Sequence, residues 1–144
     1  MNTPVLHWEI NTKEPARLLD FYRNLFGWKI QFMDQINYGL ADTGSKKGIQ
    51  GGIGRTHGEG PSFVTFYVEV DDPQQYLDKA VRLGATMVTP VTEIPNMVTF
   101  AQFRDLEGHI IGIIKQEAAP AKPRRKKTTG KKRRTRPTSK RRRR

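Results

Sequence analysis

The sequence predicts an α+β fold in which a β-α-β-β-β unit occurs twice within residues 1–117. Two observations support this prediction. Runs typical of β-strands surround one segment with helical spacing in each half, and the order of elements is the same in both halves. The halves also match in register, because Leu19-Asp20 and Leu77-Asp78 stand 58 positions apart. Chance similarity within a single unrepeated α+β domain is the alternative, and the shared register argues against it.

Module one, residues 1–57, begins with a strand whose polar and apolar residues alternate. The next segment is helical, because apolar residues recur every three or four positions, Pro15 suits the first turn and Gly27 suits the C-terminal cap. Three short strand candidates follow, each bounded by Gly, Asn or Asp. In chain order these elements are the strand 5–11, the helix 14–27 and the strands 28–34, 37–43 and 48–54.

Module two, residues 62–117, repeats this order. Its helix has Pro73 near its start and Gly84 at its end, the same two signals as in module one. A Gly-rich linker, residues 55–62, connects the modules. The expected elements are the strand 62–70, the helix 72–84 and the strands 86–94, 97–105 and 109–116.

Residues 118–144 differ from the rest of the chain in composition and charge. Residues 1–117 hold 11 Lys and Arg against 14 Asp and Glu, a net charge of −3, whereas residues 118–144 hold 15 Lys and Arg and no acid. This segment contains no Val, Ile, Leu, Met, Phe, Trp or Tyr with which to bury apolar surface. We therefore expect a disordered basic tail attached to a mildly acidic domain.

The composition also excludes several classes of protein. The chain has no cysteine, so disulfides and thiolate sites are excluded. No run approaches the roughly 18 apolar residues that a membrane span requires, and the N-terminus lacks the basic and apolar regions of a secretion signal. We expect a cytoplasmic protein, associated with the nucleoid if the source is bacterial.

Three stretches of the chain carry a family resemblance: LHWEIN with EPARLLDFYRNLFGWKI, VTFYVEVDDPQQYLDKAVRLGA, and FRDLEGHIIGII. Together they resemble the vicinal oxygen chelate superfamily, which includes glyoxalase I, bleomycin-resistance proteins and extradiol dioxygenases. The resemblance covers residues 4–116 and implies that the two modules lie side by side, with their strands in a curved sheet around a pocket. The tail has no counterpart in this pattern.

In metal-binding members of the superfamily, four side chains from the first and last strands of both modules hold a divalent cation. The resemblance places His7 at the first of these positions. The matching position in module two holds Thr65, and the last strands offer Gly112 and either Gly51 or Gly52. Protein sites for such cations use about three or four protein ligands. We therefore expect no metal, and no other cofactor is indicated.

His7 and Glu9 stand two residues apart on one strand, so their side chains share a face. On the first strand of module two, Thr65, Tyr67 and Glu69 share a face by the same rule. Three interpretations of His7 stay open. It hydrogen-bonds within a polar pocket, with Glu9 and Glu69 near the rim; it forms a metal site with Glu9 and Glu69; or it is a general base that works without metal. His7 is the best single catalytic candidate.

The other pocket candidates come from strand alternation and residue type. Phe100, Gln102 and Arg104 share one face of their strand, and Tyr38 is expected in the pocket wall with Tyr67 and Phe100. The full set of expected pocket residues is His7, Glu9, Tyr38, Thr65, Tyr67, Glu69, Phe100, Gln102, Arg104 and Gly112.

The remaining aromatic and glycine residues favour structural roles. Trp8 and Phe66 should face the helices, on the side of their strands opposite to the pocket. Phe21 and Phe26 suggest ligand stacking, but their helical spacing favours the core. The glycine-rich run GIQGGIG, residues 48–54, lacks the order and the following helix of a nucleotide-binding loop, so a strand with close backbone approach is expected.

The basic tail indicates binding to a polyanion. Lys and Arg that neutralise phosphates release counterions, which drives sequence-independent binding. The tail has no aromatic residue for base stacking and no rigid element that reads base edges. We expect nonspecific binding to DNA or RNA; acidic lipid, polyphosphate, the ribosome and a nuclear import signal are the alternatives. The expected contact residues are Lys122, Arg124, Arg125, Lys126, Lys127, Lys131, Lys132, Arg133, Arg134, Arg136, Lys140, Arg141, Arg142, Arg143 and Arg144.

The sequence thus predicts a metal-free, glyoxalase/bleomycin-resistance-like protein that binds an unknown small molecule, forms a homodimer and is attached to nucleic acid through its tail. Two alternatives stay open. One is an active lyase, isomerase or dioxygenase with a non-standard site. The other is a structural nucleoid- or chromatin-associated protein whose pocket is vestigial.

Overall fold

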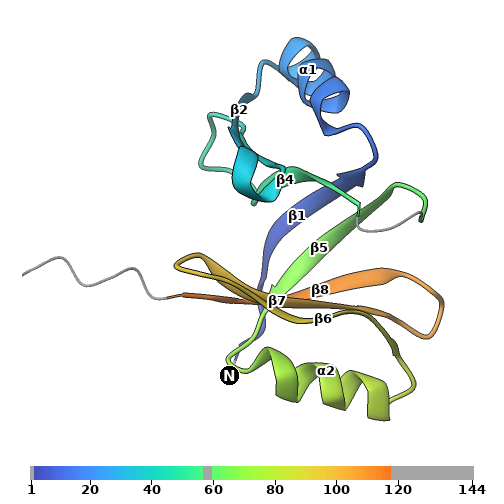
Figure 1. Cartoon of the computed structure of the whole chain (residues 1–144). Coiled ribbons are helices and arrows are strands. Elements are labelled where there is room, and N and C mark those ends of the chain that lie inside the picture. The colour runs from blue at the N-terminus through green and yellow to red at the C-terminus, as the bar shows by residue number, and fades with distance from the viewer. Residues whose placement is uncertain (1, 57–59, 118–144) are drawn as a thin grey trace, which may run out of the picture.

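A computed structural model of the chain describes residues 2–56 and 60–117 (Figure 1). The basic tail with its expected contact residues, and the linker residue His57, lie outside the described residues. The described elements are β1 (Val5–Thr12), α1 (Pro15–Phe26), β2 (Lys29–Met33), the 3₁₀ turn η1 (Asp34–Ile36), β3 (Tyr38–Asp42), β4 (Gln50–Arg55), β5 (Phe63–Glu69), α2 (Pro73–Arg82), β6 (Thr86–Ile94), β7 (Val98–Arg104) and β8 (Ile110–Gln116).

The strands form one mixed sheet in the order β2-β3-β4-β1-β5-β8-β7-β6. In each module the first strand pairs in parallel with the last, β1 with β4 and β5 with β8, and the remaining pairs are antiparallel. The modules join where β1 pairs antiparallel with β5. This topology confirms the α+β class and the two β-α-β-β-β units side by side.

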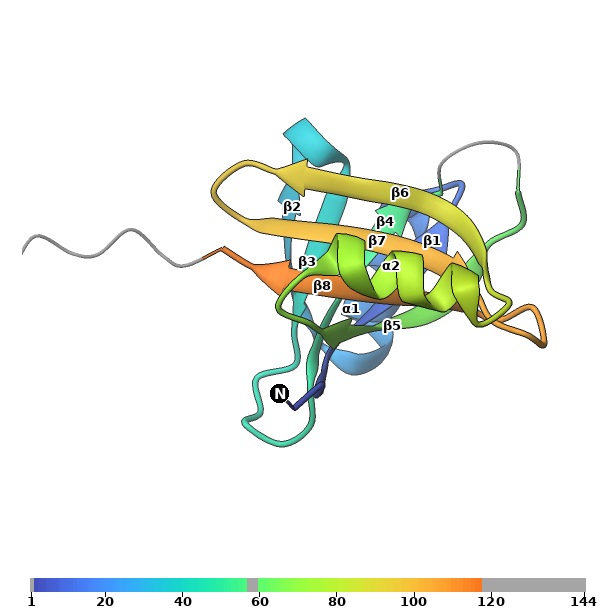
Figure 2. The same ribbon diagram turned by 90° about the horizontal axis from the view of Figure 1, so that it is seen from below.

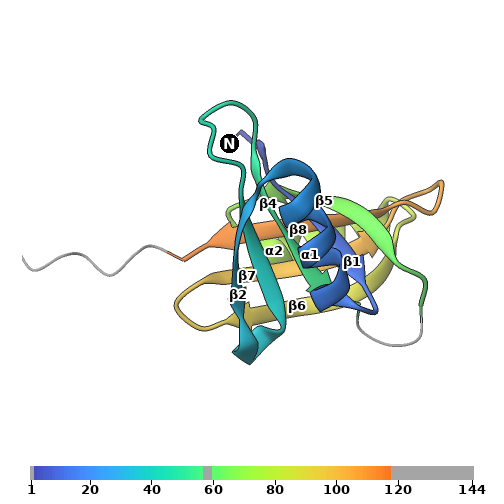
Figure 3. The same cartoon turned by 90° about the horizontal axis from the view of Figure 1, so that it is seen from above.

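The sheet is bent, and each half carries a helix on its outer side. Seen from below, α2 lies in front of β7 and β8 (Figure 2), and seen from above, α1 lies in front of module one (Figure 3). Two separate cores result. Leu19 of α1 packs with Ile30, Ala41 and Ile53, and Leu77 of α2 packs with Val70, Ala101 and Ile113. Helices α1 and α2 both lie on the outer side, and the inner faces of the two halves face each other (Figure 1).

The helix ends follow the expected signals. Gly27 has a φ of 70° and its N–H donates to the Arg23 carbonyl at 2.9 Å, so it closes α1 as a left-handed cap. The Asp72 carboxylate accepts from the Gln75 N–H at 3.1 Å and caps the start of α2. Gly84, with a φ of 105°, follows the end of α2. In the part of the chain that the structure describes, neither helix is long and apolar enough to cross a membrane.

Three residues expected in the core lie partly on the surface. Phe66 stands on the outer face of β5 and is 40% exposed. This is because α1 packs on the strands of module one and α2 packs on β6, β7 and β8, so the two helices lie to either side of β5. Phe21 and Phe26 are 54% and 55% exposed. Trp8 does pack in the core of module one, with its ring centroid 5.3 Å from that of Trp28.

Candidate functional site on the inner face

The centre of the inner face is a buried carboxylate, that of Glu9. Its neighbour Trp8 packs against the module-one core, so Glu9 projects to the opposite face of β1. The Glu9 Oε1 atom accepts hydrogen bonds from Asn11 Nδ2 at 2.7 Å and from the Tyr67 hydroxyl at 2.9 Å. The Tyr38 hydroxyl hydrogen-bonds the same carboxylate. These donors offset the hydration that Glu9, only 8% exposed, loses on burial.

The position of Glu9 corrects one expectation from the sequence, which places it near the rim of a pocket with Glu69. β1 and β5 are the two central strands of the sheet, and Glu9 lies opposite Thr65 in their pairing. Side chains on the inner face of central strands are flanked on both sides, which buries Glu9 and brings donors to it. Glu69 is half-buried at the last position of β5.

Tyr67 links the carboxylate to module two through a chain of hydrogen bonds. Gln102 Nε2 donates to the Tyr67 hydroxyl oxygen at 2.8 Å, and Thr89 Oγ1 donates to Gln102 Oε1 at 2.9 Å. The chain therefore runs in one direction, from β6 through β7 and β5 to Glu9 on β1. Such connected donors hold a buried polar group in a single arrangement.

His7 joins this network through Tyr38. The His7 Nε2 atom lies 2.7 Å from the Tyr38 hydroxyl oxygen, and the two rings are stacked with centroids 6.2 Å apart. Burial lowers the pKa of His7, so the imidazole is neutral at pH 7. Burial and the negative charge of Glu9 raise the pKa of Tyr38 and of Tyr67 well above the ordinary range. Both tyrosines therefore stay protonated and act as hydrogen-bond donors.

Two glycines leave room for the two tyrosine rings. A Cβ atom at Gly52 would lie 2.2 Å from Tyr38 Cε1, and one at Gly112 would lie 2.3 Å from Tyr67 Cδ1. Gly52 pairs with Glu9 across β1 and β4, and Gly112 pairs with Tyr67 across β5 and β8. Glu9 and Tyr67 are 58 residues apart, the offset of the repeat. Gly52 and Gly112 are therefore equivalent positions in the two modules.

Gly51, the other glycine considered for this position, belongs to the outer face. A Cβ atom there would lie 1.9 Å from the Trp8 ring. The close approaches at Gly51 and Gly52 confirm the expectation that GIQGGIG contributes a strand with tight backbone contacts, and β4 spans Gln50–Arg55.

The positions that the superfamily resemblance assigns to metal ligands do not form a metal site. Tyrosine rings fill the space above Gly52 and Gly112, so longer side chains have no room there. Thr65 is 4% exposed, and its Oγ1 donates to the Ile110 carbonyl at 2.6 Å. Over residues 2–56 and 60–117, no three His, Asp or Glu side chains lie close enough to share a metal ion. The set of His7, Glu9 and Glu69 is thus not brought together, and the residues present do not fit a divalent cation.

The structure brings some expected residues together and leaves others apart. His7, Glu9, Tyr38, Tyr67 and Gln102 form the inner-face network described above. The Phe100 ring lies edge-on to Tyr67, with centroids 6.2 Å apart. Arg104, by contrast, is exposed at the end of β7, where its Nη1 donates to the Gly108 carbonyl at 3.0 Å.

Two members of the network, Asn11 and Thr89, were not predicted from the sequence. Asn11 stands two residues after Glu9 on β1, so the alternation that pairs His7 with Glu9 would also have found it. Thr89 offered no such signal, because its contact with Gln102 depends on the pairing of β6 with β7, which contains register shifts next to Thr89.

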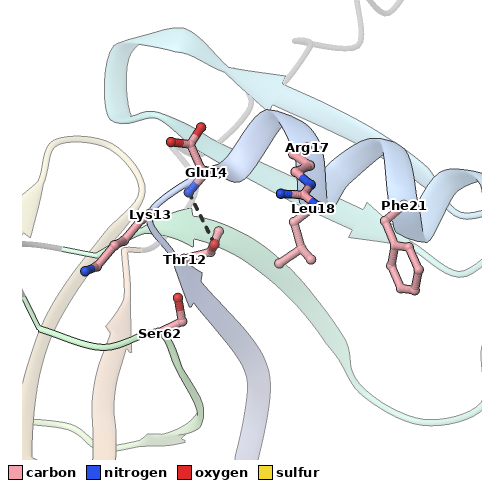
Figure 4. A pocket seen from close by; sticks show the side chains of 7 residues that line it. All are labelled: Thr12, Lys13, Glu14, Arg17, Leu18, Phe21 and Ser62. Carbon is pink, nitrogen blue, oxygen red and sulfur yellow. Dashed lines mark hydrogen bonds between the residues drawn. The ribbon is translucent and has the colours of Figure 1, made fainter.

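A separate hollow of about 460 Å³ lies where β1 leads into α1 (Figure 4). Cationic, anionic and apolar side chains are mixed along it, and the Glu14 N–H donates to Thr12 Oγ1 at 3.3 Å. None of its residues belongs to the inner-face network. The hollow is lined by Thr12, Lys13, Glu14, Arg17, Leu18, Phe21 and Ser62.

Residues 7–114 match the sequence model of a family described as a glyoxalase-like domain. The chain belongs to this family. With it the chain belongs to the vicinal oxygen chelate superfamily, as the resemblance of the sequence indicates. No curated protein matches this glyoxalase-like chain in sequence.

Solved structures share the fold of this glyoxalase-like domain. A hypothetical protein from Bacillus halodurans C-125 is 11% identical, with a TM-score of 0.58 over 85% of this chain and 100% of its own. Methylmalonyl-CoA epimerase from Mycobacterium tuberculosis is 11% identical, with a TM-score of 0.56 over 79% and 88%. A glyoxalase/bleomycin resistance protein/dioxygenase superfamily member from Vibrio splendidus 12B01 is 14% identical, with a TM-score of 0.52 over 80% and 100%. Sequence identities this low show that the fold is shared, and they do not assign the activity of these proteins to this chain.

Alanine at Gly52 or Gly112 is expected to lower the free energy of unfolding by about 1–3 kcal/mol, the usual cost of overpacking. The added Cβ would press on a tyrosine ring whose hydroxyl is held by Glu9, so the ring cannot swing away without losing a hydrogen bond. Urea denaturation measures the loss. Gly60→Ala is the matched control, because a Cβ there meets no atom within 4 Å. Equal stability of Gly112→Ala and Gly60→Ala would contradict this packing.

Proposed function

We propose that the chain is a metal-free glyoxalase-like protein that binds a small molecule at the inner face of its sheet and is attached to nucleic acid by its basic tail. The proposal that the protein is metal-free depends on one observation: the rings of Tyr38 and Tyr67 pack directly over Gly52 and Gly112. In metal-binding relatives, the resemblance puts ligand side chains at these equivalent positions. In this chain the same space is filled by the two tyrosine rings, whose hydroxyl groups donate hydrogen bonds to Glu9.

Small-molecule binding is supported by the chemistry of the inner face. Ligand sites combine apolar and aromatic walls with a few well-placed polar groups. The inner face offers this combination, because the rings of Tyr38, Tyr67 and Phe100 surround the polar groups of His7 and Gln102. One structural neighbour is a methylmalonyl-CoA epimerase, so the fold accommodates a small-molecule site in that protein.

Attachment to nucleic acid is supported by the charge of the chain. All 15 cations of residues 118–144 lack an acidic partner within that segment, and polyanions are the natural partners of such a run. We propose nonspecific binding to DNA or RNA, in the cytoplasm or on the nucleoid. The homodimer stays a prediction, and the exposed Val64 and Phe66 on the outer face of β5 are apolar surface available to a second copy.

Elemental analysis tests the metal-free proposal. The full chain, purified without a tag and dialysed briefly, is expected to hold well under one equivalent of Zn, Ni, Fe or Mn, because a single His cannot retain these ions. The His7→Ala variant is the control and should give the same low metal content. A stoichiometric metal in the unmodified chain that disappears in His7→Ala would contradict the proposal.

A further inference from the structure

We infer that the bare Nδ1 atom of His7 is the acceptor through which the inner face binds its ligand, and that this ligand is an uncharged aromatic compound with a hydroxyl donor, a phenol. The inference rests on the proposed metal-free site, because a metal would take the imidazole for itself. It assigns an atom, a tautomer and a ligand class to that site.

The hydrogen bonds around Tyr38 fix the tautomer of His7. The Tyr38 hydroxyl has one proton, and it contacts both the Glu9 carboxylate and His7 Nε2. An ionised carboxylate can only accept, so the proton of Tyr38 points to Glu9. The Tyr38 oxygen is then an acceptor, and His7 Nε2 must carry the proton that it receives. In a neutral imidazole with a proton on Nε2, Nδ1 is a bare acceptor.

The His7 ring is only partly buried. His7 is half-buried, and its side-chain hydrogen bond is made through Nε2. Within the described ranges, every fully buried side-chain nitrogen or oxygen has a hydrogen-bond partner. Since the described hydrogen bond of His7 uses Nε2, Nδ1 keeps some exposure to solvent, and we place the donor group of the ligand there.

The acceptor character of Nδ1 selects the ligand. A carboxylate or phosphate group offers further acceptors, so it finds no donor at this atom, and the negative charge of Glu9 nearby disfavours it further. A hydroxyl group supplies the missing donor. The rings of Tyr38 and Tyr67, stacked on and edge-on to His7, provide aromatic neighbours for a ring in the ligand.

Tyr38 and Glu9 are positioning residues in this arrangement. They do not contact the ligand at Nδ1 of His7. They keep the imidazole proton on Nε2, so that Nδ1 carries no proton. Without the Tyr38 hydroxyl, His7 has no partner that distinguishes its two nitrogens, and both neutral tautomers become populated.

Nitrogen-15 NMR of the full chain with labelled histidine tests the tautomer directly, without any variant at the site. At pH 7.5 the His7 resonances, assigned by comparison with His57→Gln and His109→Gln variants, are expected to show a protonated Nε2 and a bare Nδ1. Tyr38→Phe should shift His7 toward a mixture of tautomers, whereas the control Tyr22→Phe, on the outer side of the sheet, should not. A proton on Nδ1 in the unmodified chain would overturn the inference.

Three probes of similar size test the ligand class: phenol, which donates; anisole, which only accepts; and benzoate, an anion. Phenol is expected to shift the Nδ1 resonance and to bind about 10-fold more tightly than anisole, the value of about one hydrogen bond. Benzoate should bind more weakly still. In His7→Phe, phenol should lose its advantage over anisole.

Two outcomes would overturn the inference: preference for benzoate, or absence of phenol binding while Nδ1 is bare. Metal content is measured on the same samples. A stoichiometric metal at His7 would instead show that the proposed function fails, so the two failures are distinguishable.

Discussion

The affinity of the full chain for duplex DNA is expected to fall by roughly 10³ to 10⁴ between 50 and 200 mM salt. The tail holds 15 cations, and in a chain without apolar anchors about half of them engage phosphates at once. Each neutralised phosphate adds about 0.9 to the slope of log affinity against log salt, so about 7 contacts give a slope near −6. Fluorescence anisotropy with a labelled duplex at a series of salt concentrations measures this slope.

The chain that ends at Glu117 is the first control for this prediction. Its net charge is −3, so it should not bind the duplex, and its melting temperature should be close to that of the full chain. A tail of the same composition in scrambled order should bind equally well. Binding by the chain ending at Glu117, or a 100-fold preference for one DNA sequence, would show that the folded domain itself reads nucleic acid.

Most of the fold could be predicted from the sequence because the relevant signals are local. Helix α1 was expected over residues 14–27 and runs from Pro15 to Phe26, since a proline in its first turn and a left-handed glycine fix its ends. The eight strand candidates, recognised as short runs typical of strands, correspond to β1–β8. The 3₁₀ turn Asp34–Ile36 was not predicted. It lies between β2 and β3, and the apolar pattern alone does not distinguish such a short turn from the ends of the strands that flank it.

The site could be predicted only in part, because its geometry depends on pairing between distant strands. Alternation correctly put His7 and Glu9 on one face. It could not show that Tyr38, from β3, would reach across Gly52 to both of them, since this requires the register of β3 on β4 and of β4 on β1. The sequence showed that positions 52 and 112 lack side chains that could bind a metal. It did not show that the glycines Gly52 and Gly112 leave space for the rings of Tyr38 and Tyr67.

The inner-face network also differs from a metal centre in the side chains that the fold must bring together. A metal site needs strong donors that converge on one point, whereas this network surrounds an acceptor, Glu9, with donors from Asn11, Tyr38 and Tyr67. Glu9 and Tyr67 occupy equivalent places in the two modules and bond to each other where the modules join. The carboxylate therefore couples the two halves of the sheet, and its removal should be felt in the stability of the whole domain.

Replacement of Glu9 by leucine is accordingly expected to lower the free energy of unfolding by about 3 kcal/mol or more. Leucine is similar in size but accepts no hydrogen bond, so the Asn11 amide and the hydroxyls of Tyr38 and Tyr67 lose their acceptor. A buried donor left unpaired costs about 1–3 kcal/mol, and Asn11 and Tyr67 are both buried. For a domain whose total stability is about 5–15 kcal/mol, the loss is large. Chemical denaturation of the full chain, followed by tryptophan fluorescence, measures it.

The matched control is Glu9→Gln, which keeps one acceptor oxygen at the same place. It should lose about 1 kcal/mol, because Asn11 and Tyr67 can still donate to that oxygen while the contact with Tyr38 is weakened. The Tyr67→Phe variant removes one donor to Glu9 and also the acceptor of Gln102 Nε2, but leaves the carboxylate with Asn11 and Tyr38, so its loss should fall between the two. If Glu9→Leu were as stable as the unmodified chain, the carboxylate would not hold the modules together, and the hydrogen-bond chain from Thr89 to Glu9 would have no energetic role.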